Sequence, residues 1–409
     1  MSKTKIAYLI KGIGAYNSHI KPLIDNCPFE DFDFIILHLN RLFTPKDIIQ
    51  DPRVRFVDLT LNWNLKKVFA NNELNLITTI NPGNIFDIFT VSLANSLGIP
   101  TVYYQHGIQL DFTSFDQKKL IQGISGSRKV KSIYKYLFFI FYFIFNLFLV
   151  KDKWFFFNSI FLKMSYLIFP KLHKNIPKYG LRKTHCNYAF VYGEHDRRYL
   201  MESMGMENSK IFITGYPFLK PSNSFKVENE NKIALFISAG LRSVGVIPLS
   251  LNQEIQFYRK LSERVNEIGY VLYVKLHPLE NIDDFKILMS SNLIRFFKNE
   301  NLANMTKYSA LIIGEYSTAL FYPIKYFKPL FILKSEFFDH YPFDFTKYGV
   351  GISTTMETIT EDMKIYFELN DQQFKDYNLF LSEYVMNSND EDPIGMYYDK
   401  IREIVSQNS

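Results

Sequence analysis

Short apolar runs that alternate with amphipathic stretches constrain the fold of this chain more than any other feature. In the N-terminal half the strand-like runs read KIAYLIK, DFIILHL, VRFVDL, NLITTI and TVYYQ. The stretch between the last two, NIFDIFTVSLANSLG, has helical spacing and ends in glycine, as helices often do. Strands that alternate with helices form βαβ units, so we predict an α/β fold with parallel sheets.

The alternation occurs twice along the chain. YAFVYG and KIFITG close the first half, and the pattern restarts with KIALFISAG, YVLYVKLHP, ALIIGEYST and KPLFIL. Between the halves, residues 217–232 are polar and contain two prolines, which is typical of a linker. We predict two Rossmann-like domains facing a cleft: an N-terminal domain (1–216) and a C-terminal domain (233–409). The last stretch, from about residue 358, is predicted to be helical and to pack back across the first domain.

Residues 117–183 interrupt the first domain with a basic and aromatic segment. It holds twelve lysines and two arginines against one acidic residue, a net charge of +13 in a chain whose total is +6. Its uncharged centre, residues 136–150, reads YLFFIFYFIFNLFLV. As a helix this centre would be about 22 Å long, shorter than the ~30 Å hydrocarbon core of a bilayer. We expect a helical insertion that lies in an anionic membrane surface, with a hairpin packed on the protein as the alternative.

Other partners and locations follow from composition. Nucleic acid is not expected, because the aromatic residues form continuous blocks rather than isolated stacking residues among the cations. Cys27 and Cys186 lie far apart and show no metal or redox spacing, which fits reduced thiols in the cytosol. The apolar run at residues 6–10 is too short for a signal peptide. We expect a cytoplasmic protein, peripheral on the inner face of the cell membrane, with no cofactor and no bound metal.

Four groups of residues follow predicted strands, where ligands bind in open α/β sheets. In the first, Gly12 and Gly14 precede a helix that we expect to begin near His19. Free N–H groups at a helix start bind an anion or a sugar, and the glycines let a ligand approach closely. An ordinary strand-to-helix turn is the alternative.

The second group is YYQHGIQLDF, which places His106 at the tip of a predicted strand. An imidazole there can take a proton from an acceptor hydroxyl, and Asp111 can orient it or hold it charged. A histidine that merely fills a loop is the alternative. The predicted acceptor-binding residues are Gly12, Gly14, His19, Gln105 and Asp111.

The third group is YVKLHPLE, in which Pro278 stops the strand directly after His277. An imidazolium at this position can neutralise a leaving phosphate, with help from Lys275 or Arg242. A capping histidine is the alternative. Gly240 completes this side of the predicted donor site.

The fourth group is GEYST, in which Ser317 and Thr318 lie where a helix is predicted to begin. Hydroxyl and N–H groups at such a position form a phosphate site, or they simply cap the helix. A carboxylate would repel a phosphate, so we expect Glu315 to bind a ribose hydroxyl instead.

The order of these motifs resembles a known pattern. HG at His106, GYP at residues 215–217, HP at His277, and ST at Ser317 followed by KP are similar to motifs of the GT-B glycosyltransferases of bacterial surface polysaccharides. The nearest likenesses are the CDP-glycerol glycerophosphotransferases and the bacterial sialyltransferases and polysialyltransferases, over about residues 103–333. The resemblance implies that His106 is the catalytic base, that His277 contacts the donor phosphate, and that Ser317 with Thr318 holds the same group.

The motifs and the basic insertion together predict the reaction. We expect an inverting, metal-independent glycosyltransferase that moves a sugar, or a polyol phosphate, from a nucleotide-activated donor to a membrane-linked surface glycan. The donor nucleotide is left open between CMP or CDP and UDP, and the acceptor is a glycan or a lipid-linked glycan. Two alternatives remain: a nucleotide-sugar epimerase of the two-Rossmann type, and a non-catalytic factor in polysaccharide assembly.

Overall fold

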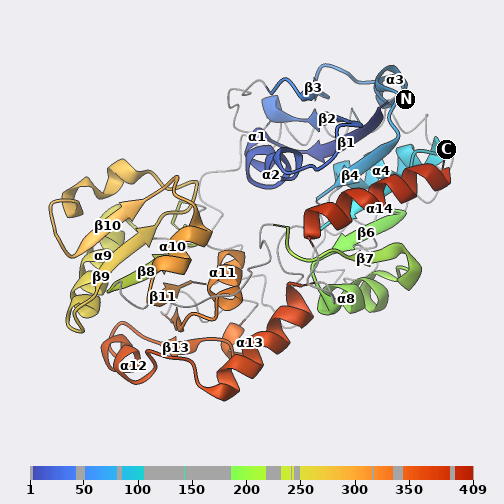
Figure 1. Cartoon of the computed structure of the whole chain (residues 1–409). Coiled ribbons are helices and arrows are strands. Elements are labelled where there is room, and N and C mark those ends of the chain that lie inside the picture. Colours follow the sequence, from blue (N-terminus) through green and yellow to red (C-terminus); the bar gives the residue numbers. More distant parts are fainter. Residues whose placement is uncertain are drawn as a thin grey trace, which may run out of the picture. The chain divides into compact units, whose positions relative to one another are not determined.

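Two parallel sheets with interleaved helices dominate the computed structural model of the chain (Figure 1). They belong to two compact units. The first unit contains the described residues up to Gln105, Tyr142, residues 186–217 and the chain from Met386 onward, and the second contains those from Lys232 to Val385. The structure describes residues 3–42, 51–80, 85–105, 142, 186–217, 232–240, 242–243, 249–315, 317–334, 344–386 and 392–408. This architecture confirms the predicted α/β fold class.

The first unit is built on a seven-stranded sheet in the order β3-β2-β1-β4-β5-β6-β7, in which neighbouring strands are parallel. The order reverses between β1 and β4, which is where ligands bind in doubly wound sheets. The strands are β1 (Thr4–Ile10), β2 (Phe32–His38), β3 (Val54–Asp58), β4 (Leu76–Thr79), β5 (Thr101–Tyr104), β6 (Tyr188–Val191) and β7 (Ile211–Ile213).

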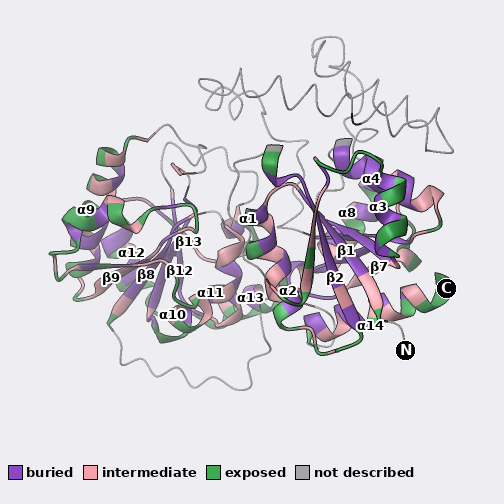
Figure 2. Cartoon of the chain, turned by 90° about the horizontal axis from the view of Figure 1, so that it is seen from above, coloured by how far each residue is buried: buried purple, intermediate pink, exposed green. Residues whose placement is uncertain are grey.

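Helices cover both faces of the first sheet, and its central strands β1, β4 and β5 are largely buried, whereas the edge strands β3 and β7 are mostly half-buried (Figure 2). Tyr8 and Ile36 face one cluster of buried side chains, whereas Ala7 and Leu9 face the other, as alternation along a strand requires. The described helical segments are α1 (Ile13–Ala15), the π-helical η1 (Tyr16–Ile20), α2 (Lys21–Asp25), η2 (Asn40–Leu42), α3 (Leu65–Asn72), α4 (Ile85–Ser96), α8 (Glu194–Met204), η5 (Asn208–Lys210) and α14 (Pro393–Asn408).

The second unit carries a six-stranded parallel sheet in the order β10-β9-β8-β11-β12-β13. This order has the same reversal, here between β8 and β11. The strands are β8 (Ile233–Ile237), β9 (Val271–Lys275), β10 (Ile294–Phe297), β11 (Leu311–Gly314), β12 (Leu330–Leu333) and β13 (Ile352–Thr354). The described helical segments are α9 (Leu251–Asn266), η6 (Ile282–Leu288), α10 (Leu302–Tyr308), η7 (Thr318–Leu320), α11 (Phe321–Lys325), η8 (Phe345–Tyr348), α12 (Ile359–Ile365) and α13 (Asp371–Tyr384).

Helix α9 shows how the sequence specifies this packing. Ser250 caps its start: the Ser250 hydroxyl accepts the N–H of Gln253, and the Gln253 side chain bonds back to the Ser250 backbone. Tyr258, Leu261 and Val265 then recur at helical spacing and are buried against the sheet. The helix therefore begins at a fixed residue and presents one apolar face to β8 and β9.

The C-terminal helix α14 belongs to the first unit, although it follows the second unit in the sequence. Tyr397, Ile401 and Ile404 are buried in the same cluster as Tyr8 and Phe190. The predicted C-terminal domain of residues 233–409 thus extends further than the second unit, because this apolar face is buried only against the first sheet. Of the predicted linker, the structure describes only Pro217 and Lys232.

Of the predicted insertion at residues 117–183, the structure describes only Tyr142. This tyrosine is helical, is 1% exposed and lies in the core cluster of the first unit. Its ring centroid is 5.8 Å from that of Trp63 and 6.0 Å from that of Phe86. At this residue the insertion packs on the protein. None of the helices in the described part of the chain has the length and hydropathy to cross a bilayer.

Candidate active site

The carboxyl ends of three neighbouring strands gather most of the predicted donor residues. Gly240 follows β8, His277 follows β9, and Glu315 follows β11. Because β9, β8 and β11 are parallel and adjacent, these residues share one edge of the second sheet. Because the predicted donor residues lie here, we call residues 238–240, 242, 275–280 and 315 the donor edge.

His277 is half-buried, and its hydrogen bonds define which nitrogen carries the proton. Its Nδ1 accepts the N–H of Leu279 at 3.2 Å. Burial, and to a lesser degree the charge of Lys275, lowers the pKa of His277 below its usual value. The neutral ring therefore carries its proton on Nε2 at pH 7 and can donate it to an anion.

The backbone of Gly240 lies directly against the imidazole of His277. A Cβ placed on Gly240 would lie 2.6 Å from Cβ and 2.7 Å from Cγ of His277. Gly240 also has a positive φ of 62°, which other residues rarely adopt. Both facts require glycine at this position, so the sequence fixes how closely the loop after β8 approaches the histidine.

Two buried carboxyl groups hold the loops of the donor edge. Glu280 Oε2 accepts the N–H of His277 at 2.6 Å, and Glu315 Oε2 accepts the N–H of Ala239 at 2.9 Å. Burial is the largest cause that raises the pKa of Glu280 to about 7 and that of Glu315 to about 8. Repulsion by Glu254 raises both further, and Glu280 adds to the effect at Glu315. Glu315 thus accepts a loop N–H, and its expected contact with a ribose hydroxyl stays a prediction.

The two predicted helper cations have partners within the protein. Arg242 forms ion pairs with Glu254 and, at 2.9 Å, with Asp284. Burial opposes the charge of Arg242, but these two carboxylates raise its pKa overall. Lys275 Nζ donates to the carbonyl of Lys298, and burial lowers the pKa of this lysine. Their roles in donor binding stay predictions.

Ser317 is the N-cap of the short helix η7, whose first residue is Thr318. Its hydroxyl accepts the N–H of Ala319 at 3.2 Å, so the capping alternative describes this contact. Both side chains are half-buried. Pro278, directly after the histidine, is exposed.

In the first unit, the glycines Gly12 and Gly14 lie where they were predicted, after β1. Gly12 is the extended residue before the helix, and the N–H of Ile13 reaches Asn40 Oδ1 at 3.5 Å. The helical segment begins at Ile13, not near His19, so that expectation was wrong. His19 instead lies inside the π-helical turn η1, which continues into α2.

Gln105 is fully buried at the end of β5. Its side-chain Oε1 accepts the N–H of Tyr192 at 2.7 Å, and its carbonyl accepts the Tyr192 hydroxyl at 2.8 Å. These bonds tie the end of β5 to the end of β6. The predicted base His106 and the predicted Asp111 lie outside the described residues.

Several residues at these edges were not predicted. Glu280 is part of the donor edge, and Glu254 pairs with Arg242 of that edge. The spacing of Glu280, three residues after His277 in HPLE, is the signal that would have found it. In the first unit His38 ends β2, and its Nδ1 accepts the N–H of Asn40 at 3.3 Å. His38 is 2% exposed, and burial is the main cause that lowers its pKa.

Among the described residues, one pair of aspartates with the D-x-D spacing used by metal-dependent transferases lies in the first unit. Asp31 and Asp33 form a D-x-D triplet at the amino end of β2, the opposite edge from the glycines. They pair with Arg402 at 2.7 Å and with Lys3 at 3.5 Å, respectively. Over the residues the structure describes, no group of three or more His, Cys, Asp or Glu side chains is arranged to hold a metal ion.

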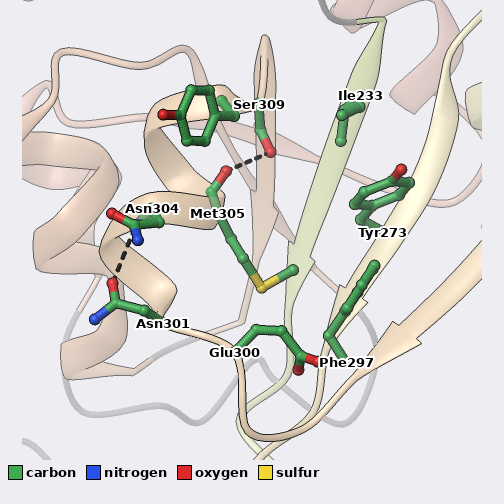
Figure 3. Close-up of a pocket in the computed structure, with 9 residues that line it drawn as sticks. Ile233, Tyr273, Phe297, Glu300, Asn301, Asn304, Met305 and Ser309 are labelled. Carbon is green, nitrogen blue, oxygen red and sulfur yellow. Dashed lines mark hydrogen bonds between the residues drawn. The ribbon is translucent and has the colours of Figure 1, made fainter.

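A cavity of about 360 Å³ lies between α10 and the sheet of the second unit (Figure 3). Met305 of α10 faces Tyr273 and Phe297, whose ring centroids are 4.9 Å apart. The polar lining residues include Glu300 and Asn304. The cavity does not include the residues of the donor edge, so it is a separate feature.

Comparisons with known proteins agree with this architecture. The wall teichoic acid polymerase TagF superposes with a TM-score of 0.56 at 12% identity, over 99% of this chain and 89% of TagF. S. aureus MnaA with UDP gives 0.50 at 13% identity over 98% and 97% of the two chains. A glycosyltransferase from Rickettsia africae ESF-5 gives 0.50 at 11% identity over the full length of both. These similarities show a shared GT-B fold.

The sequence identifies the family. No curated protein matches the chain. A family model described as Alpha-2,8-polysialyltransferase (POLYST) matches residues 64–330, well over half of the chain, from just before α3 through the start of β12. The protein is therefore a glycosyltransferase of surface polymer synthesis that belongs to the alpha-2,8-polysialyltransferase family.

Proposed function

We propose that this protein is an inverting, metal-independent glycosyltransferase that moves a sugar, or a polyol phosphate, from a nucleotide-activated donor to a membrane-linked surface glycan. The observation that carries the proposal is the setting of His277. A half-buried imidazole presents an Nε2–H at a strand end, held by Leu279 and backed by Gly240. This is the arrangement that binding and release of a phosphate require.

The donor binds at the donor edge of the second unit. A phosphate beside His277 favours the imidazolium, so the lowered pKa of the empty site rises when the donor arrives. The ring then neutralises the charge that develops on the leaving nucleotide. Solved structures of the similar proteins TagF and MnaA carry CDPG and UDP, respectively, which supports a pyrimidine nucleotide as donor.

The acceptor is deprotonated by His106. A hydroxyl oxygen of the glycan attacks the transferred group in line, its proton passes to the imidazole, and the bond to the nucleotide phosphate breaks. A single displacement of this kind inverts the configuration at a transferred sugar. The buried amide of Gln105 supports this role, because it fixes the chain immediately before the histidine.

The insertion at residues 117–183 holds the enzyme on an anionic membrane surface at the inner face of the cell membrane. Its charge of +13 and its aromatic blocks support this placement. Tyr142 is buried in the first unit, so the membrane contacts belong to the basic flanks. Exchange of Lys129, Lys131 and Lys135 for glutamate should therefore release the protein from anionic vesicles and leave its melting temperature unchanged. Sedimentation with neutral vesicles is the control, and undiminished binding to anionic vesicles would contradict the proposal.

Nucleotide binding tests the donor site directly. Calorimetry with CMP, CDP, UDP and GDP should reveal one preferred base, and His277→Ala should weaken that affinity at least tenfold, about 1.4 kcal/mol. His195→Ala is the matched control, because His195 is a half-buried histidine of the first unit. Unchanged affinity in His277→Ala would refute the assignment.

Dependence on an acceptor distinguishes the proposal from its alternatives. Nucleotide release should require an added glycan and should stop in His106→Ala. Release without any acceptor would instead indicate an epimerase, and binding without release would indicate an assembly factor. NMR of a sugar product should show the configuration opposite to that of the donor, and retention would overturn the single displacement.

A further inference from the structure

Three carboxyl groups meet beneath the loops that carry Gly240 and His277. Glu280 bonds to the N–H of His277, and Glu315 bonds to the N–H of Ala239. Glu254 reaches the same place from α9, and all three are at most 8% exposed. The loops of the donor edge therefore rest on a buried acidic cluster, which we define as Glu254, Glu280 and Glu315.

The charges around this cluster do not balance when all three carboxyls are ionised. Arg242 is the cation paired with Glu254, and it also pairs with Asp284. Lys275 and Lys298 lie nearby, but their ammonium groups donate to the backbone carbonyls of Lys298 and Glu280. Buried negative charge that is not paired directly with a cation is costly, so the cluster retains protons at neutral pH. The described atoms include no hydrogen-bond partner for Glu280 Oε1, which leaves room for a proton there. The titratable and charged groups that face the cluster are Tyr258 on α9, Arg242 after β8, Lys275 at the end of β9, His277 after β9, Asp284 on η6, and Lys298 after β10.

We propose, resting on donor binding at this edge, that Glu280 and Glu315 are positioning residues whose carboxyl groups take up a proton when the anionic donor binds. Each holds a loop N–H whether or not it is ionised, because a carboxyl oxygen accepts the bond in both forms. The negative phosphate beside His277 favours the neutral carboxyls. The proton comes from solvent, is bound by one of the two carboxylates and returns to solvent when the nucleotide leaves.

Coupling of this kind is reciprocal, so donor affinity must depend on pH. The raised pKa values of Glu280 and Glu315, about 7 and about 8, place the effect above neutrality. Affinity is high where the carboxyls are protonated and falls as the pH rises through these values. CMP is a suitable probe, because its phosphate has a second pKa of about 6 and is already ionised above pH 7.

Calorimetry of CMP binding at pH 7.0 and 8.5, in two buffers of different ionisation enthalpy, measures both affinity and proton uptake. For the wild-type protein we expect a loss of about tenfold in affinity over this range and an uptake of about half a proton at pH 7.5. Glu280→Gln and Glu315→Gln should each flatten the pH profile and reduce the uptake, and the double variant should retain only the smaller pH dependence that protonation of His277 contributes. Glu368→Gln, at an exposed position on the same unit, should behave as wild type.

The conservative variants separate positioning from folding. Glutamine keeps an oxygen for the His277 N–H, so Glu280→Gln should bind CMP at pH 7.0 within about threefold of wild type, whereas Glu280→Ala should lose about tenfold or more. Melting temperatures establish that each variant is folded. An unchanged pH profile and proton uptake in Glu280→Gln and Glu315→Gln would overturn the inference. Absence of binding to CMP, CDP and UDP by the wild-type protein would instead overturn the proposed function.

Discussion

The loops at the carboxyl edges of the two sheets are held by different kinds of side chain. In the first unit amides hold the loops: Asn40 accepts an N–H after β1, and Gln105 accepts one after β6. In the second unit the corresponding acceptors are the buried carboxyls Glu280 and Glu315. An amide keeps its charge state at every pH, whereas a buried carboxyl does not. The amide acceptors of the first unit therefore stay uncharged at every pH, whereas the charge of the carboxyl acceptors of the second unit changes with pH and with bound anions.

The histidines at the two edges also differ, in how far each is exposed. His277 is half-buried at the donor edge, whereas His38 is 2% exposed at the end of β2. We expect His277→Ala to lower kcat about 10²–10³-fold, because the leaving charge loses its donor, with little change in stability. His38→Ala should instead cost about 2–4 kcal/mol of stability and leave CMP affinity unchanged. Steady-state kinetics and chemical denaturation check both, and the reverse pattern would break the comparison.

The stability of the second unit should fall as the pH rises. Glu280 and Glu315 have folded pKa values of about 7 and about 8, against an ordinary value of 4.5, so between pH 4.5 and 8 the unfolded chain has lost protons that the folded unit keeps. The stabilisation that these two protonated carboxyl groups provide below pH 4.5 is therefore lost progressively as the pH rises from 4.5 to 8. At pH 8.5 we expect Glu315→Gln to gain about 2–3 kcal/mol, and at pH 4 to gain nothing. Hydrogen exchange of β8 and β11 measures this, with β1 as the internal reference.

A carboxyl group introduced at the carboxyl edge of the first sheet should make the stability of the first unit depend on pH. Gln105→Glu retains an oxygen for the N–H of Tyr192 but buries a titratable group. The first unit should then lose about 1–2 kcal/mol of stability between pH 5 and pH 8, while the second unit keeps its own profile. Hydrogen exchange of β5 and β6 gives the readout. A variant as indifferent to pH as wild type would show that the environment, not the carboxyl, sets the difference.

Replacement of glycine by alanine should lower stability at the donor edge and raise it at the carboxyl edge of the first sheet. Gly240→Ala places a Cβ against His277 at a positive φ, so we expect a loss of about 1–3 kcal/mol and weaker CMP binding. Gly14→Ala meets open space within a helical turn, so we expect a gain of up to about 1 kcal/mol. Thermal denaturation of both variants, in parallel, decides the sign.

Much of the fold could be predicted from the sequence because its central strands are long apolar runs. Residues such as those of β1, β2 and β9 read as strands, and α9 reads as an amphipathic helix. The edge strands β10 and β13 were missed, because IRFF and IST are too short to show a pattern. The start of the first helix was misplaced at His19, since a π-helical turn before Pro22 has no sequence signature.

The residues that form the surface of the donor edge could be predicted from the sequence, whereas the residues that support them could not. His277 and Gly240 follow strands and could be found from position alone. The burial of Glu280 could not be predicted, because it depends on packing with α9, which is distant in sequence. Arg242 looked free for the same reason, since Glu254 and Asp284 lie 12 and 42 residues away. The resemblance to the polysialyltransferases is confirmed by the family match, and the role of His106 stays a prediction.

The position of α14 has a consequence for how the protein is made. The first sheet packs Tyr8 and Phe190 against Tyr397, which leaves the ribosome almost 400 residues after the first strand is synthesised. The core cluster of the second unit runs from Ala234 to Met363, so among the described residues it needs no later segment. During translation the unit that is second in sequence therefore completes its core first. Until α14 is synthesised, the N-terminal strands expose the apolar surface that this helix later covers.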